Sequence, residues 1–140
     1  YLQWMYPDAK FIFLVRNPWD CWRSYKGYVW TYRWPKQVIT KVSQFAMLWK
    51  KQTSELLKFS GGNSMVLRYE DFLKDDFDWD GLREFTELPN ITQKGLEKRI
   101  RGIAIKPQPV SELDLVTIEK ICGPLANQLG YVGLKETKFD

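Results

Sequence analysis

The fold is decided by residues 10–24, which read Lys-Phe-Ile-Phe-Leu-Val-Arg-Asn-Pro-Trp-Asp-Cys-Trp-Arg-Ser. The five apolar residues 11–15 are too few for a buried helix, and they are rich in aromatic and β-branched side chains, so they predict a buried strand. Pro18 suits the first position of a helix, and Asn17 suits the capping position before it. The stretch therefore predicts a strand that passes directly into a helix and leaves Arg16 at the carboxyl end of the strand. Open α/β sheets bind their ligands at that end.

Two side chains of this stretch are candidates for binding an anion. The Arg16 guanidinium offers a planar fork of donors that fits phosphate oxygens, and the Ser24 hydroxyl adds a neutral donor from the next helix. Hydrogen bonds to a charged group contribute roughly 1.5–3 kcal/mol each, so two of them can discriminate between nucleotides that differ by one phosphate. Asp20 falls in the first turn, where the helix dipole stabilises a carboxylate. A strand that merely ends in a surface arginine is the alternative interpretation.

The pattern Arg16-Asn-Pro-x-Asp-x-x-x-Ser24 resembles the 3′-phosphate-binding motif of sulfotransferases that use 3′-phosphoadenosine 5′-phosphosulfate (PAPS). In that family a strand is followed by Arg-Asn/Asp-Pro-x-Asp and by a serine eight residues after the arginine. Residues 7–12, Pro-Asp-Ala-Lys-Phe-Ile, are similar to the family's lead-in to the strand. The resemblance implies that Arg16 and Ser24 hold the 3′-phosphate. Trp22 and Arg23 depart from the pattern, and Arg23 is expected either to face solvent or to add a charge near the phosphate.

Two further stretches resemble the same family. Residues 67–72, Leu-Arg-Tyr-Glu-Asp-Phe, resemble its Tyr-Glu-Asp motif, which implies that Tyr69 contacts the adenine ring. Packing of this tyrosine over a sheet edge is the alternative, and Glu70 and Asp71 are expected to cap and support the fold. Residues 121–131 end in Leu-Gly-Tyr, as does the C-terminal helix of many sulfotransferases, which is a packing feature.

A third candidate for the 3′-phosphate lies in the basic stretch 99–106, which reads Arg-Ile-Arg-Gly-Ile-Ala-Ile-Lys. Cytosolic sulfotransferases carry an Arg-Lys-Gly-x-x-Gly loop whose basic residue also meets the 3′-phosphate. The match here is degenerate; it implies Arg101 as a cofactor-binding residue, with a solvated basic loop as the alternative. In the family, the glycine-rich 5′-phosphosulfate loop and the catalytic histidine or glutamate precede the arginine motif. No catalytic residue is therefore expected within these 140 residues.

Composition favours a folded domain and gives little support to nucleic-acid binding. The chain has 140 residues, 16% of them aromatic, which suits one domain with a real core. Its 21 basic and 17 acidic residues give a net charge of +4, and the basic residues are scattered without a long run. Cys21 and Cys122 have no metal-like or redox-like spacing, so free buried thiols in a reducing compartment, the cytoplasm, are expected. No apolar run approaches the roughly 20 residues that span a bilayer, and no signal-peptide pattern is present.

The hydrophobic pattern predicts two strands and several helices. Strands are expected at 10–15 and 65–67, and helices at 1–6, 18–29, 36–59, 80–88, 92–100 and 112–129. The last helix is expected to be capped by Ser111 and stopped by Gly130. The apolar face of the helix at 36–59 comprises Val38, Val42, Phe45, Leu48, Trp49, Leu56 and Phe59. The apolar face of the last helix comprises Leu113, Val116, Ile118, Ile121, Leu125 and Leu129.

The hydrophobic pattern predicts an α/β fold with a parallel sheet flanked by helices, and the resemblance implies that it is the P-loop-like sulfotransferase fold. Residues 1–140 are expected to be the C-terminal portion of a single sulfotransferase domain, which needs its upstream half as a partner. The resemblance implies transfer of the sulfuryl group from PAPS to a hydroxyl or amine of a small-molecule or glycan acceptor. The product is 3′-phosphoadenosine 5′-phosphate (PAP), and no metal is required. A pocket for the acceptor could involve Trp30, Tyr32 and Trp34, although packing is the alternative for them.

Two other functions remain open from the sequence. The chain could be a non-catalytic nucleotide-binding or protein-interaction module derived from the same fold, since it contains no histidine to act as a base. It could also be a relative of the P-loop kinases. Preference for ATP without selectivity for a 3′-phosphate would indicate the kinase relative.

Overall fold

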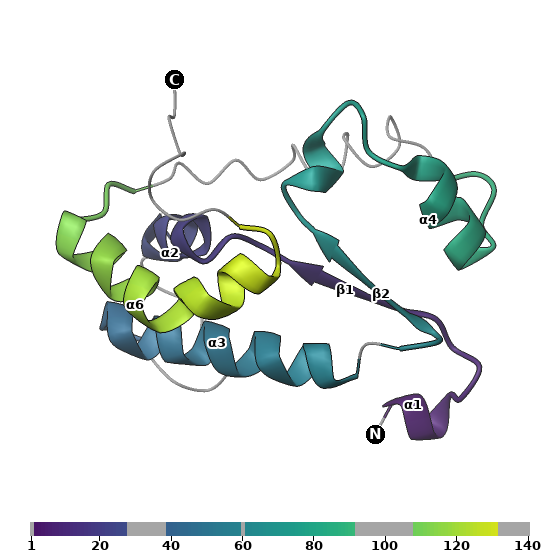
Figure 1. Ribbon diagram of the computed structural model, residues 1–140, viewed down its shortest axis with the longest axis horizontal. Coiled ribbons are helices and arrows are strands. Elements are labelled where there is room, and N and C mark those ends of the chain that lie inside the picture. Colours follow the sequence, from purple (N-terminus) through teal and green to yellow (C-terminus); the bar gives the residue numbers. More distant parts are fainter. Residues whose placement is uncertain (1, 28–38, 60, 92–107, 132–140) are drawn as a thin grey trace. The chain divides into compact units, whose positions relative to one another are not determined.

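The structure, a computed structural model, describes residues 2–27, 39–59, 61–91 and 108–131 of the chain (Figure 1). Helices and strands alternate in the first part of the chain, and helices follow. In chain order the elements are α1 (Leu2–Met5), β1 (Phe11–Val15), α2 (Pro18–Gly27), α3 (Val42–Lys58), β2 (Ser64–Arg68), the 3-10 helix η1 (Asp71–Leu73), α4 (Trp79–Thr86) and α6 (Glu112–Gln128). The mixture of helices with a parallel sheet confirms the predicted α/β class.

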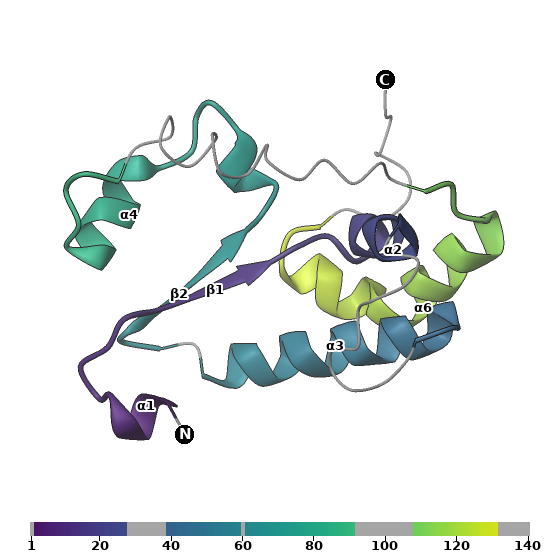
Figure 2. The same ribbon diagram turned by 180° about the vertical axis from the view of Figure 1, so that it is seen from behind.

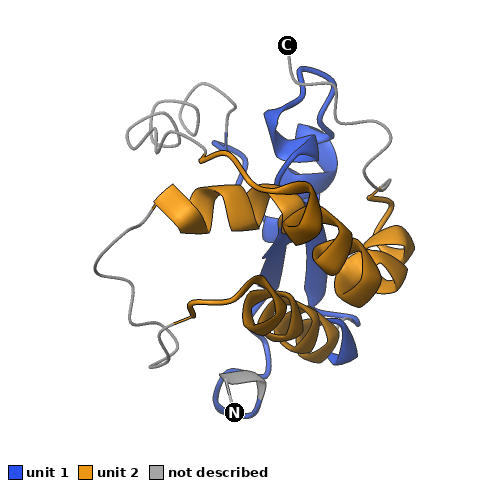
Figure 3. Cartoon of the chain, turned by 90° about the vertical axis from the view of Figure 1, so that its left-hand side faces the viewer, with its two compact units in different colours: residues 1–15, 57–104 blue, residues 16–56, 105–140 orange. Residues whose placement is uncertain are grey.

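The chain divides into two compact units, which Figure 3 shows in different colours. Unit 1 comprises residues 1–15 and 57–104, and it contains the sheet and α4. Unit 2 comprises residues 16–56 and 105–140, and it contains α2, most of α3, and α6. Each unit is described below by itself.

The sheet of unit 1 consists of β1 and β2, which run parallel and side by side in both views (Figures 1 and 2). Phe11 pairs with Ser64 at one end of the ladder, and Val15 pairs with Arg68 at the other. The ladder continues by one hydrogen bond, since the Tyr69 amide donates to the Val15 carbonyl at 2.8 Å. Parallel strands require a long crossover connection, and α2 and α3 lie between these two strands in the chain. The predicted strand–helix–strand order is therefore confirmed.

One face of this sheet is open. Ile12 and Leu14 of β1 are 44% and 54% exposed, and the ladder pairs them with Met65 and Leu67 of β2. Paired residues of parallel strands point to the same face, so these four apolar side chains share it. Parallel sheets are usually covered on both faces, and a face of this kind is what a further layer of structure would cover.

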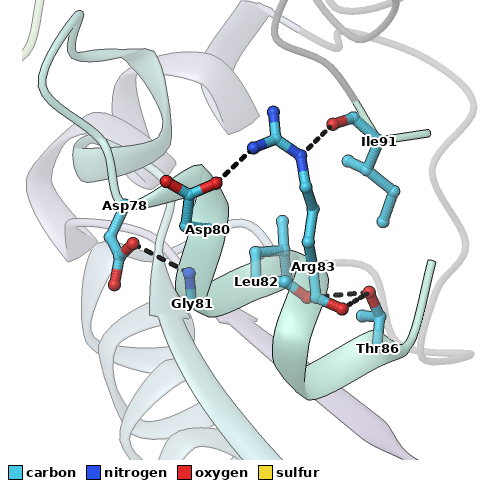
Figure 4. A network of polar contacts seen from close by, with 7 residues as sticks. All are labelled: Asp78, Asp80, Gly81, Leu82, Arg83, Thr86 and Ile91. Carbon is cyan, nitrogen blue, oxygen red and sulfur yellow. Dashed lines mark hydrogen bonds and ion pairs between the residues drawn. The ribbon is translucent and has the colours of Figure 1, made fainter. Parts of the chain in front are cut away.

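Helix α4 begins with a capping aspartate and carries a network of polar contacts (Figure 4). The Asp78 carboxylate accepts a hydrogen bond from the Gly81 amide at 2.8 Å. One turn on, the Arg83 guanidinium forms an ion pair with Asp80 and donates through Nε to the Ile91 carbonyl at 3.0 Å. This arginine therefore joins the helix to the segment that follows it.

The end of α4 is set by a residue in a left-handed conformation. Glu87 has φ 57°, which stops the helix after Thr86, whereas the sequence pattern had extended it to Leu88. A residue in the left-handed conformation commonly ends a helix, but it is usually glycine or asparagine, so a glutamate does not predict this helix end. The Glu87 carboxylate pairs with Lys10, which lowers the pKa of this exposed glutamate below its usual range.

Helix α3 of unit 2 begins at Val42, later than the predicted start at residue 36. The Gln44 side chain accepts hydrogen bonds from the Thr40 and Lys41 amides, each at 3.2 Å. These contacts satisfy amides that precede the first turn, and they fix where the helix starts. Residues 38–40, Val-Ile-Thr, are also β-branched, and such a run disfavours a helix.

The buried rows of α3 and α6 differ from the predicted apolar faces. Leu113 and Val116 of α6 and Phe59 after α3 are exposed, so these three assignments to a core were wrong. Burial follows the face that each helix presents to its neighbours, and small or polar side chains occupy part of it. The buried residues of these helices are Phe45, Ala46, Trp49 and Thr53 of α3, and Ile118, Cys122, Gly123 and Ala126 of α6.

Both predicted ends of α6 are confirmed. The Ser111 side chain accepts a hydrogen bond from the Asp114 amide at 3.1 Å, which caps the first turn. Gly130 has φ 76° and ends the helix, and Tyr131 beyond it is buried. No helix among the described residues is long and apolar enough to cross a membrane.

Candidate anion-binding site at the start of α2

The structure brings together the two side chains that the first motif predicts. Arg16 follows β1 directly, and its Nη1 donates a hydrogen bond to Ser24 Oγ at 3.2 Å. Both side chains are half-buried. The spacing of eight residues places Ser24 in the second turn of α2. Side chains of a helix tilt toward its N-terminus, so the Ser24 hydroxyl can reach the Arg16 side chain. The guanidinium and the hydroxyl therefore lie next to each other at the start of α2.

The start of α2 is fixed by Asn17, as predicted. The buried Asn17 side chain accepts hydrogen bonds from the Trp19 amide at 2.9 Å and from the Asp20 amide at 3.2 Å. Pro18 is the first helical residue. Since Asn17 occupies these two amides, an anion at this junction would be held by the Arg16 and Ser24 side chains and not by these helix amides.

The sequence left two possibilities for Arg23, facing solvent or adding a charge near the phosphate. The structure excludes the first, because the side chain is largely covered. Its guanidinium pairs with Asp20 at 2.9 Å, and both side chains are largely covered. The pairing neutralises much of the charge of Arg23 within α2. An arginine paired in this way within its own helix is a weak candidate for binding an anion.

The Arg16 backbone has a partner that sequence reasoning missed. Trp49 of α3 donates through Nε1 to the Arg16 carbonyl at 3.0 Å. The sequence placed Trp49 on an apolar face only. A buried indole N–H is expected to find an acceptor, but the sequence does not say which one.

A second missed contact fixes α2 against the beginning of α6. Trp22 donates through Nε1 to the Asp114 carboxylate at 3.1 Å, and the Lys26 ammonium lies 3.8 Å from the same carboxylate. Lys26 also donates to the Pro109 carbonyl at 3.0 Å. Trp22 and Lys26 flank Ser24 in the chain, so these contacts hold the part of α2 that carries the hydroxyl.

Tyr69 belongs to unit 1, where it directly follows β2. Its amide completes the ladder to Val15, so its position is fixed at the carboxyl end of the strand. The Asp71 carboxylate just beyond it accepts hydrogen bonds from Arg68 and from Lys74, the latter at 2.8 Å. Asp71 thus supports the fold as predicted. Glu70 was also expected to cap, but its side chain makes no capping hydrogen bond to η1.

The Asp71 contacts predict a pH-dependent stability. Hydrogen bonding to Arg68 holds the pKa of Asp71 below its ordinary value of 3.8, and the contacts of Lys74 act in the same direction. A depressed pKa stabilises the fold above about pH 4, and this contribution is lost as the pH falls through the folded-state pKa. We expect Asp71→Asn to lower the free energy of unfolding at pH 7 by about 1 kcal/mol, or roughly 3 °C in Tm. Thermal melts at pH 7 and pH 3 measure this, and the difference from wild type should shrink at pH 3.

Asp75→Asn is the matched control for that experiment. Asp75 is exposed in the same loop, and no ion pair of this carboxylate is present among the described residues. The control should leave Tm unchanged at both pH values. An equal loss from both variants would show that the Asp71 contacts contribute nothing specific.

The two cysteines are free, as predicted, but only Cys122 is buried. Burial raises the pKa of the Cys122 thiol to about 12, and its Sγ lies 3.3 Å from the Ala46 carbonyl, to which it donates. This thiol is neutral at physiological pH and is not a nucleophile. Cys21 is half-buried, which corrects the expectation for that residue.

Several predicted features lie outside the described residues. These are the cofactor-binding candidate Arg101 and its basic stretch, the helix at 92–100, and the aromatic residues Trp30, Tyr32 and Trp34. Within the part of the chain that the structure describes, no group of three or more acidic or cysteine side chains is arranged to hold a metal ion.

Comparison with known proteins identifies the family. The sequence model of the sulfotransferase family matches residues 1–89, which include β1, the Arg16–Ser24 pair and β2. Searches of curated proteins and of solved structures gave no significant match. The matched residues form the strand–helix–strand unit and carry both predicted binding motifs, and they make up more than half of the chain. The protein therefore belongs to the sulfotransferase family of sulfuryl-transferring enzymes.

Proposed function

We propose that the protein uses PAPS as its sulfuryl donor and that Arg16 and Ser24 hold the 3′-phosphate of this nucleotide. The observation that carries the proposal is the convergence of the two side chains, whose polar atoms lie 3.2 Å apart at the start of α2. A guanidinium and a hydroxyl that lie side by side can both donate to the oxygens of one phosphate group. Their immediate neighbours Asn17 and Asp20 are occupied in capping and ion pairing, so the two donors are held in place by a rigid helix start.

The residues of this chain would bind and orient the nucleotide. When bound, PAPS supplies a sulfuryl group for transfer to a hydroxyl or amine of a small-molecule or glycan acceptor, and PAP remains. Arg16 and Ser24 lie at the end of the nucleotide away from the transferred group, so their contribution is affinity and alignment. The proposed reaction requires no metal.

We propose Tyr69 as the residue that contacts the adenine ring. Its support is local to unit 1: the Tyr69 amide is bonded to the carbonyl of Val15, the residue that precedes Arg16 in the chain. Asp71, held by Arg68 and Lys74, fixes the turn in which Tyr69 lies. Arg101 stays a proposed additional ligand of the 3′-phosphate on the basis of its sequence alone.

We also propose that residues 1–140 form the C-terminal portion of a single sulfotransferase domain. The support is the open face of the sheet, where Ile12 and Leu14 are 44% and 54% exposed, and the presence of only two strands among the described residues. Two-stranded sheets are marginal by themselves, and three or more strands are needed for stability. Free thiols at Cys21 and Cys122 favour a reducing compartment, and we propose the cytoplasm.

Calorimetric titration with PAP and with adenosine 5′-phosphate tests the proposal. The full-length protein should bind PAP at least tenfold more tightly, because only PAP carries the 3′-phosphate. Tyr69→Ala should weaken binding of both nucleotides by a similar factor, about 5- to 150-fold, since stacking on an adenine contributes about 1–3 kcal/mol. Tyr69→Phe keeps the ring, and it should bind nearly as well as wild type.

The same titration separates the alternatives. Tighter binding of ATP without preference for PAP would contradict the proposal and favour a relative of the P-loop kinases. Tight binding of PAP without sulfate transfer by the full-length protein to a broad acceptor panel would indicate a non-catalytic binding module. Unchanged affinity in Tyr69→Ala would remove Tyr69 from the site without affecting the assignment of the phosphate anchor.

A further inference from the structure

We infer that Trp49 is a positioning residue for the phosphate anchor, which it orients through the backbone of Arg16. The inference rests on the proposed role of Arg16. Trp49 lies in α3, far from either binding motif in the sequence, and its side chain is only 8% exposed. Its indole N–H donates to the Arg16 carbonyl at 3.0 Å.

This contact acts on the peptide group that joins Arg16 to Asn17. The next residues are already fixed, since the Asn17 side chain caps the Trp19 and Asp20 amides and the Asn17 carbonyl accepts from the Cys21 amide at 2.9 Å. The Arg16 carbonyl therefore lies at the last peptide before the rigid helix start. Holding it sets the direction in which the Arg16 side chain leaves the backbone. The Cys21 thiol, at 3.8 Å from the same carbonyl, is a much weaker donor.

The donor itself is held rigidly. Trp49 belongs to the buried row of α3, and the neighbouring Ala46 accepts a hydrogen bond from Cys122 of α6 at 3.3 Å. The contact of this buried side chain therefore couples the position of α3 to the Arg16 backbone. Binding groups need to be held within about 0.5 Å of their productive geometry, which is the precision that such supporting contacts supply.

The expected consequence is a loss of selectivity, not only of stability. Without the indole N–H the Arg16 peptide can rotate, and the guanidinium spends less time directed toward Ser24. Trp49→Phe should therefore reduce the preference for PAP over adenosine 5′-phosphate by about 5- to 10-fold, which is the worth of one net hydrogen bond. Binding of adenosine 5′-phosphate itself should change by less than about twofold, because that nucleotide does not use Arg16.

Trp19→Phe is the matched control. Trp19 is 2% exposed in α2, and its indole N–H has no hydrogen-bond partner among the described residues. The two variants make the same change in a buried tryptophan, but only one removes a contact with Arg16. Both should lower Tm by comparable amounts, and Trp19→Phe should keep the selectivity of the wild type. Should Trp49→Phe fail to fold, 3-benzothienylalanine at position 49 preserves the shape of the ring system and removes only the N–H.

The experiment is calorimetry of PAP and adenosine 5′-phosphate binding to the full-length wild type, Trp49→Phe, Trp19→Phe and Arg16→Ala. A selective loss in Trp49→Phe and Arg16→Ala, absent from Trp19→Phe, supports the inference. A selective loss in Arg16→Ala alone overturns the role of Trp49 and leaves the proposed function intact. Unchanged selectivity in Arg16→Ala overturns the proposed function itself. Equal losses in the two tryptophan variants would mean that Trp49 acts only through packing.

Discussion

Arg16→Ala is expected to weaken binding of PAP by about 30-fold and binding of adenosine 5′-phosphate by less than about twofold. Truncating one partner of a hydrogen-bonded charge pair costs about 2–5 kcal/mol in a desolvated site, and we take the lower end because Arg16 is half-buried. The Ser24 hydroxyl, 3.2 Å from the guanidinium, would be the donor that remains. Calorimetric titration of the full-length variant with both nucleotides measures the two effects separately.

Two further variants make this test specific. Arg16→Lys keeps the charge but loses the planar fork, so it should recover only part of the lost affinity. Arg23→Ala removes a nearby cation of α2 that is already paired with Asp20 at 2.9 Å, so it should weaken binding of both nucleotides equally and only slightly. Equal losses of the two nucleotides in Arg16→Ala would contradict the assignment of the 3′-phosphate to this site.

Residues 1–140 produced by themselves are expected to show no sulfate transfer above background. Ile12 and Leu14 leave an apolar part of one sheet face exposed, and unpaired strand edges promote aggregation. The chain contains no histidine. The Asp71 carboxylate of the Tyr-Glu-Asp motif accepts hydrogen bonds from Arg68 and Lys74. A group engaged in this way, at the proposed adenine end, is poorly placed to act as a base for the transferred group.

A radiolabelled sulfate-transfer assay measures this, with a broad acceptor panel and the full-length protein as the positive control. Circular dichroism and thermal melts of residues 1–140 establish whether the segment is folded, so that inactivity can be separated from unfolding. Turnover by a folded segment at a rate comparable to that of the full-length protein would overturn the proposal that it supplies nucleotide anchoring without the reacting groups.

The sequence predicted the elements whose local signals are strong. The apolar run before Arg16, the Asn17-Pro18 helix start and the Ser111 cap each depend on contacts within a few residues, and all three are confirmed. The start of α3 and the end of α4 were placed wrongly. Side-chain contacts of Gln44 fix the start of α3, and the left-handed conformation of Glu87 fixes the end of α4; neither residue type signals this role.

The candidate site divides in the same way. Arg16 and Ser24 could be found from the sequence because the first two turns of α2 set the distance between them. The structure brings them within hydrogen-bond distance. Trp49 and Asp114 could not be found from the sequence, because their partners Arg16 and Trp22 lie 33 and 92 residues away from them in the chain. Both tryptophan contacts depend on which face of a helix turns inward.

The sequence by itself determined the family, the strand-to-helix junction and the pair of donors at the start of α2, because short-range spacing and capping are encoded in neighbouring residues. Only the tertiary structure decided which side chains hold that junction in place. Trp49 of α3 and Asp114 of α6 make the contacts that hold the junction. Leu113 and Val116 of α6, which the apolar pattern assigned to a buried face, are exposed instead. The physical reason is that the acceptor of a buried indole N–H depends on how the helices pack together, which local sequence patterns do not encode.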